Sequence, residues 1–250
     1  MKQTTKGFSS DRLARVEAME RWHFWFRGRG ILVRELLGRE KIGSGALHLE
    51  LGCGTGRMAQ EMMERGHRVV GVDLRPEGLD ALRKADPSAM LVRADATLLP
   101  FRADAFDVVT ALDVIEHVDD SAALTELHRI LSPSGRAVLS VPAVPWLWSG
   151  RDVDAGHLRR YTPRLLRSAL IRARLAVVAM RYYQFVLFPL IVASRLLGKA
   201  RLSHGTQRHE EMRIPVLNRV LGWVNGAEAM VAAKIPLPWG SSLVVVCKPV

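Results

Sequence analysis

A chain of 250 residues with 48% hydrophobic residues can bury a sizeable core, which excludes a disordered protein and a small disulfide-stapled domain. Its two cysteines, Cys53 and Cys247, lie too far apart for a metal-binding pair, and isolated thiols are typical of a reducing cytoplasm. The net charge of +11 is uneven, because residues 155–250 hold 15 Lys and Arg against three acidic residues, which predicts either an anionic partner or only a solubilising surface.

The N-terminal stretch predicts helices. Residues 1–22 lack the apolar core of a signal peptide, and the sequence has no apolar run of about 18 residues, so we predict no transmembrane helix. Residues 8–38 are expected to form one or two helices that carry the aromatic cluster Trp22-His23-Phe24-Trp25-Phe26. We expect residues 1–44 to act as a helical lid.

Short strands and helices alternate over the first half of the chain. We predict strands at 47–51, 68–74, 89–95, 106–113 and 135–142, and helices at 57–66, 77–85 and 120–132, the last one ended by Pro133. Strands that alternate with helices of this length are typical of a parallel, doubly wound α/β sheet.

The second half is less regular. We predict a loop at 143–163, a helix at 162–173, a sixth strand at 175–183, an apolar segment at 184–198, a polar basic loop at 199–213, a helix at 216–234 and a seventh strand at 241–248. The helix at 216–234 places Leu217, Val220, Val224, Ala227 and Val231 on one face. The chain is therefore expected to form a single domain, 1–250, with its core in residues 45–183 and 241–250.

A glycine loop follows the first predicted strand. The segment Glu50-Leu51-Gly52-Cys53-Gly54-Thr55-Gly56 has glycines at alternate positions and leads directly into a helix. Glycines let the backbone turn tightly and approach a ligand, and helix-start N–H groups favour an anionic or polar ligand, although an ordinary strand-to-helix turn has the same form.

Asp73 ends the next strand, where a carboxylate can bind both hydroxyls of a ribose. That arrangement also suits NAD. However, the spacing is G-x-G-x-G instead of G-x-G-x-x-G, and no Tyr-x-x-x-Lys pair of a short-chain dehydrogenase is present.

Five segments in order, ELGCGTG, VVGVDL, ADATLLPF, FDVVTALDVIEHV and HRILSPSGRAVLSVP, together resemble the motifs of class I S-adenosylmethionine-dependent methyltransferases over roughly residues 45–142. The resemblance implies S-adenosylmethionine as cofactor and a Rossmann-like, mostly parallel seven-stranded sheet. The N-terminal Trp-His-Phe-Trp-Phe, the GHLRRY segment and the closing PLPWGSSLVVVCKP also resemble a bacterial subgroup of these enzymes that has no defined substrate.

The same resemblance implies the cofactor-binding residues. Glu50, Gly52, Gly54 and Gly56 should line the methionine end, Asp73 with Leu74 the ribose side, Asp95 with Ala96 the adenine amine, and Asp113 the region of the transferred methyl group. Taken alone, Asp95 and Asp113 are equally compatible with solvated carboxylates at strand ends.

The loop AVPWLWSGRDVDAGHLRRY (143–161) follows the fifth strand, whose carboxyl end faces the ligand crevice in such sheets. His157 is a candidate general base because its ordinary pKa lies near neutrality, and Asp154 is the expected carboxylate to orient it. The alternative is a structural loop in which Asp and Arg side chains pair.

Glu116-His117 resembles a pair in ubiquinone-type O-methyltransferases, where a metal can bind. Two adjacent ligands without identified partners do not predict a metal site, so we predict no metal and assign the pair to a helix start.

About 57 residues, 184–240, separate the last two strands where this family usually has a near-direct hairpin, and we expect a helical insertion that forms a lid or a docking surface. The segment FVLFPLIVA (185–193) is too short to span a bilayer. An apolar segment beside basic residues favours peripheral membrane contact, although a helix packed on the sheet has the same pattern. The basic residues that follow the segment are Arg195, Lys199, Arg201, Arg208 and Arg213.

These observations favour a cytoplasmic enzyme, active in solution or at the inner membrane surface, that methylates an oxygen or nitrogen of a small-molecule or lipid-linked acceptor. A first alternative is an RNA methyltransferase, but the sequence has no Asn/Asp-Pro-Pro-Tyr/Phe motif and no appended RNA-binding module, which makes nucleic acid a poor partner. A second is a cofactor-binding scaffold without catalysis, which the intact glycine loop and Asp73 disfavour.

Overall fold

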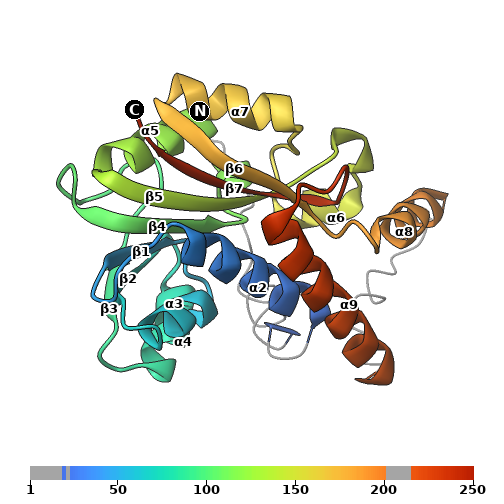
Figure 1. Ribbon diagram of the computed structural model, residues 1–250, viewed down its shortest axis with the longest axis horizontal. Helices are drawn as coiled ribbons and strands as arrows, with labels where there is room; N and C mark the ends of the chain where they lie inside the picture. Colours follow the sequence, from blue (N-terminus) through green and yellow to red (C-terminus); the bar gives the residue numbers. More distant parts are fainter. Residues whose placement is uncertain (1–18, 21–22, 201–214) are drawn as a thin grey trace.

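A seven-stranded sheet forms the centre of the computed structural model, which describes residues 19–20, 23–200 and 215–250 (Figure 1). The strand order is β3-β2-β1-β4-β5-β7-β6, and β7 alone runs antiparallel to its neighbours. The predicted mostly parallel, doubly wound sheet is therefore confirmed. The strands are β1 (Leu47–Leu51), β2 (Arg68–Asp73), β3 (Met90–Arg93), β4 (Phe106–Leu112), β5 (Leu131–Pro142), β6 (Leu175–Tyr183) and β7 (Ser242–Pro249).

Helices cover both faces of the sheet (Figure 1). Helices α5 (Asp120–Ile130) and α7 (Pro163–Arg172) lie on one face, and α2 (Phe24–Arg39), α3 (Arg57–Met63), α4 (Pro76–Ala85) and α9 (Pro215–Lys234) lie on the other. Successive residues of a strand point to opposite faces, so Val138 of β5 packs with α2, α3 and α9 while Leu139 packs with α5 and α7. Strands that are apolar on both sides thus hold two hydrophobic cores.

The described part of the insertion between β6 and β7 is helical, as predicted, and contains α8 (Phe188–Ala200) and α9. The residues predicted as a polar basic loop fall mostly at 201–214, outside the described residues, as do 1–18 and 21–22. Within the described ranges, no helix is both long and apolar enough to cross a bilayer.

The apolar face predicted on α9 is not its packed face. Leu217, Val220 and Val231 are about half exposed, whereas the buried side presents Gly226 and Ala229 toward α2. A Cβ on Gly226 would lie only 3.4 Å from Ile31, so small residues let the two helices approach closely. The larger apolar side chains are left on the surface.

Several segment boundaries differ from the predictions, and strand β5, for example, begins at Leu131 instead of residue 135. The predicted loop at 143–163 contains the short helices η2 (Pro145–Leu147) and α6 (Gly150–Ala155). Helix α6 begins where the Ser149 N–H donates to Asp152 Oδ2 at 2.9 Å, an N-terminal cap typical of helices. Helix α5 ends at Ile130 instead of residue 132, because Leu131 is already extended and Ser132 precedes a proline.

Candidate functional site

A cavity of about 1350 Å³ opens at the carboxyl ends of the central strands. Its walls come from the ends of β1, β2 and β4, from α2 and the short helix η1 (Ile115–His117), and from α6, α8 and α9. The predicted site residues that line it are Glu50, Gly52, Gly54, Asp73, Leu74, Asp95, Ala96, Asp113 and His157.

The glycine loop turns through left-handed backbone conformations. Gly56, with φ of +77°, is the N-cap of α3, and a Cβ there would lie 2.4 Å from Leu82 Cδ1. By contrast, a Cβ added at Gly54 would have as its nearest neighbour the carbonyl oxygen of Gly52, at 3.9 Å. Gly54 therefore presents open backbone to the cavity, whereas Gly56 turns the chain and does not line the cavity.

Asp73 holds this loop in place. Its Oδ2 accepts a hydrogen bond from the Gly54 N–H at 3.0 Å, and its Oδ1 accepts one from the Arg75 N–H at 2.9 Å. The carboxylate is thus fixed at the end of β2, beside the loop and facing the cavity.

Glu50 is a buried carboxylate at the end of β1. Its side chain is nearly inaccessible, and its Oε2 has no hydrogen-bond partner among the described residues. Burial raises the pKa of Glu50 well above its ordinary value, and the charge of Glu20 adds to the effect. An unpaired buried oxygen at this wall fits the positively charged amino group of S-adenosylmethionine, which would satisfy it.

Asp113 is held by three elements. It follows β4 with a left-handed φ of +57°, and its Oδ1 accepts a hydrogen bond from Ser140 Oγ of β5 at 3.0 Å. Its Oδ2 forms an ion pair with Arg29 of α2, whose guanidinium lies 4.5 Å from the centre of the Trp25 ring. Helix α2 is therefore tied directly to this end of the cavity.

The adenine-side residues lie at the opposite edge. Asp95 is exposed, and its Oδ1 accepts hydrogen bonds from the N–H and hydroxyl of Thr97, each at 2.8 Å. Ala96 is buried and Leu74 is exposed, and both line the cavity.

The carboxylate that contacts His157 is Asp152, which corrects the expectation for Asp154. His157 Nδ1 lies 2.9 Å from Asp152 Oδ1, whereas Asp154 is on the exposed side of α6 and does not line the cavity. Burial alone would raise the pKa of Asp152, but hydrogen bonds from His157 and Arg160 and the charges of Arg160 and Arg195 lower it below its ordinary value. Asp152 is therefore an ionised acceptor.

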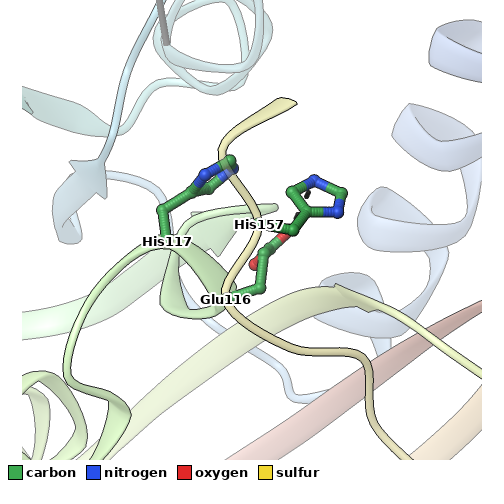
Figure 2. Close-up of side chains that lie close together, drawn as sticks. All are labelled: Glu116, His117 and His157. Atoms are coloured by element: carbon green, nitrogen blue, oxygen red, sulfur yellow. Dashed lines mark ion pairs between the residues drawn. The ribbon is translucent and has the colours of Figure 1, made fainter. Parts of the chain in front are cut away.

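Glu116 and His117 meet His157 across the cavity wall, and Figure 2 shows the three side chains converging from η1 and from the segment after α6. His157 Nε2 lies 4.0 Å from Glu116 Oε1, and the two imidazole rings are 4.9 Å apart between centres. Glu116 is fully buried, and burial together with the charge of Asp113 raises its pKa well above the ordinary value.

The other side chains of the 143–161 loop hold the loop itself. Arg160 pairs with Asp152 at 2.7 Å, and Tyr161 donates its hydroxyl to Asp120 of α5 at 2.8 Å. The structural alternative predicted for this loop thus applies to most of it. Arg195, expected in a basic surface stretch, instead reaches inward to Ser149 and Asp152.

Sequence reasoning missed Arg29, Asp152 and the convergence of Glu116 with His157. The Ser149-x-x-Asp152 spacing is a recognisable helix cap and was the one local signal for a buried Asp152. Contacts between residues 40 or more positions apart leave no such signal.

Comparison with known proteins agrees with this geometry. Residues 49–139 match the model of a methyltransferase domain. An uncharacterized methyltransferase of Mycobacterium tuberculosis is 36% identical over 111 residues, 44% of this chain and 43% of that protein. The demethylmenaquinone methyltransferase of Thermus thermophilus is 45% identical over 105 residues, 39% of this chain and 48% of that protein. The matched regions thus span about half of these relatives.

The fold extends further than the sequence similarity. A chain of the solved complex between the Haloferax volcanii Trm112 methyltransferase activator and a methyltransferase superposes with a TM-score of 0.64 at 20% identity, covering 94% of both chains. The whole described fold, and not only the matched segment, is therefore that of known proteins.

Proposed function

We propose that the chain is a class I S-adenosylmethionine-dependent methyltransferase, like the methyltransferase domain that residues 49–139 match, and that it transfers a methyl group to an oxygen or nitrogen of a small-molecule or lipid-linked acceptor. One observation carries the proposal: the residues expected to bind the cofactor and the cluster around His157 line the same cavity. Donor and acceptor can therefore meet out of bulk water.

We assign the cofactor contacts from the positions of the side chains. Asp73 binds the ribose hydroxyls, Asp95 with Ala96 meets the adenine amine, and Glu50 receives the amino group of the methionine moiety. The backbone of the glycine loop lies beside the cofactor, and at Gly54 no neighbouring group prevents a close approach.

When bound, S-adenosylmethionine supplies an electrophilic methyl group. The lone pair of the acceptor atom bonds to the methyl carbon, and the carbon–sulfur bond breaks with its electron pair kept by sulfur. The proton of the acceptor passes to a base. We place the acceptor atom beside His157, with Asp152 as the positioning residue. Asp113 and its ion pair with Arg29 border the path between the two ligands. The protein's contribution is thus alignment and exclusion of water.

Isothermal titration calorimetry tests the cofactor assignment. We expect S-adenosylmethionine and S-adenosylhomocysteine to bind with dissociation constants on the order of 1–10 μM, and NAD not to bind. Binding of NAD without binding of S-adenosylhomocysteine would overturn the proposal.

We further propose that the enzyme docks on a membrane through α9. Val216, Val220 and Trp223 recur at helical spacing on its exposed side, and Trp223 is 77% exposed. The same helix contributes Leu217 and Leu221 to the cavity wall. An amphiphilic acceptor held by this surface therefore lies close to the cavity. The demethylmenaquinone methyltransferase relative is in keeping with such an acceptor.

The charge of the described residues supports this docking less than the apolar side chains do. Arg164, Arg167 and Arg172 lie on α7, which covers the opposite face of the sheet from α9, and α9 itself carries only Arg219 and Lys234. The basic residues at 201–213 lie outside the described residues. We therefore expect Trp223 to contribute most to the contact.

Co-sedimentation with anionic liposomes at physiological salt tests the docking. Trp223→Ala should weaken binding roughly 10–150-fold, since inserting a large apolar side chain contributes about 1.5–3 kcal/mol. Ile171→Ala is the matched control, because Ile171 is 63% exposed on α7. The docking proposal fails if the wild type does not sediment with liposomes, or if filter binding shows tight RNA binding instead.

A further inference from the structure

Glu116 is a buried carboxylate whose position favours the binding of a ligand. It is 0% exposed, it lines the cavity, and neither of its carboxylate oxygens has a hydrogen-bond partner within the described part of the chain. Burying a carboxylate in this way is costly unless a cation or a donor meets it. The two guanidinium groups whose charges act on Glu116, those of Arg29 and Arg160, are already paired with Asp113 and Asp152.

In the two imidazole rings near this carboxylate, Nδ1 is the nitrogen that contacts an oxygen atom, and His157 Nε2 lies 4.0 Å from Glu116 Oε1. His117 Nδ1 lies 3.2 Å from the carbonyl oxygen of Gly156, which can only accept, so Nδ1 carries the proton. His157 Nδ1 likewise donates to the ionised Asp152. In both neutral rings the lone pair is therefore on Nε2.

A histidine whose Nδ1–H is held by a carboxylate or a carbonyl, with Nε2 directed inward, is the usual arrangement around a protein-bound metal. The backbone fixes the two segments to each other as well, since the Leu158 N–H donates to the Glu116 carbonyl at 2.8 Å. The fold therefore brings these side chains together from two segments, η1 and the segment that follows α6 (Figure 2).

We propose that Glu116, His117 and His157 form a binding site for a divalent transition-metal ion. Their ligand atoms all lie within 4.8 Å of one another. Ligands of a tetrahedral zinc ion at about 2.0–2.1 Å are roughly 3.4 Å apart, so small side-chain movements close the site. Two imidazoles and one carboxylate suit zinc or another first-row ion, and the three leave a coordination position open to the cavity.

The open position gives the ion a role, which rests on the proposed function. An acceptor oxygen bound there is polarised by the ion, which lowers the pKa of its hydroxyl group so that the proton leaves to water. His157 then acts as a metal ligand beside the acceptor, and Asp152 as the residue that positions it.

Metal binding can be measured without cofactor or acceptor. Untagged protein is stripped with a chelator and titrated with Zn²⁺ against a chromophoric competitor, and with Co²⁺, whose visible absorption reports the coordination. We expect one equivalent to bind, with affinity reduced on the order of 100-fold by Glu116→Gln or His157→Ala, and 10–100-fold by Asp152→Asn. His128→Ala, on α5 away from the cluster, should leave binding unchanged.

The outcomes separate the two proposals. A wild type that binds S-adenosylhomocysteine but no Zn²⁺, or whose Zn²⁺ affinity is unchanged in folded Glu116→Gln, overturns the metal site and leaves the proposed function intact. Stoichiometric Zn²⁺ binding without binding of S-adenosylhomocysteine supports the site and overturns the proposed function. Thermal unfolding of each variant verifies that the comparison is between folded proteins.

Discussion

Replacing Asp73 is the most direct test of the cofactor site. In Asp73→Ala the carboxylate loses its expected bonds to the ribose, and the Gly54 and Arg75 N–H groups lose their acceptor. Hydrogen bonds to a charged group contribute about 1.5–3 kcal/mol, and each 1.4 kcal/mol is about tenfold in affinity. We therefore expect S-adenosylhomocysteine to bind roughly 10–150-fold more weakly.

Titration calorimetry at 25 °C measures this change. The affinity of Asp73→Asn for S-adenosylhomocysteine should lie between those of the wild type and Asp73→Ala, because the amide oxygen of Asn can still accept a hydrogen bond from one of the two N–H groups. Asp80→Ala removes a carboxylate from the exposed side of α4 and should leave the affinity unchanged. An Asp73→Ala protein that unfolds cooperatively and binds S-adenosylhomocysteine as tightly as the wild type would refute the assignment.

Three further outcomes are expected. Gly56→Ala should destabilise the protein by about 2–4 kcal/mol in urea unfolding, because it strains a left-handed backbone and overpacks Leu82, whereas Gly38→Ala, with open space on helix α2, should be neutral or slightly stabilising. Burial lowers the pKa of His48 to about 3, below its unfolded value of 6.5, so the unfolded chain takes up a proton below pH 6.5 that the folded protein does not. The free energy of unfolding should therefore fall by about 1.4 kcal/mol per pH unit below pH 6.5. His48→Gln should reduce this pH dependence between pH 6.5 and 5, and an equal pH dependence in both proteins would contradict the reasoning. With the acceptor in hand, His157→Ala should lower turnover roughly 100-fold or more while the affinity for S-adenosylhomocysteine stays the same; full turnover would remove His157 from the site.

Features set by local pattern were predictable from the sequence. The alternation of apolar strands with short helices predicts the sheet, and the glycine loop followed by Asp73 predicts which strand ends meet the cofactor. The register of β1 with β2 and β4 then brings Glu50, Asp73 and Asp113 to one edge of the sheet.

Features set by contacts between distant segments were not predictable. Asp113 pairs with Arg29, which lies 84 positions earlier in the chain, and no local pattern links the two residues. On α9 the packed side is chosen by how closely a helix of small residues can approach α2, which apolar periodicity does not report. Arg195 is basic in sequence but is drawn inward by a carboxylate 43 positions away.

The placement of β7 has a consequence for how the chain assembles. Among the described strands, β6 pairs with β7 alone. Strand β7 is also the partner of β5, and it follows β6 in the chain after the helices α8 and α9. Until β7 is in place, β5 and β6 both present open edges, and contacts between segments so far apart in sequence form slowly. The first four strands can pair earlier, so the half of the sheet next to α8 and α9 is expected to be the last to fold and the segment most exposed to aggregation during refolding.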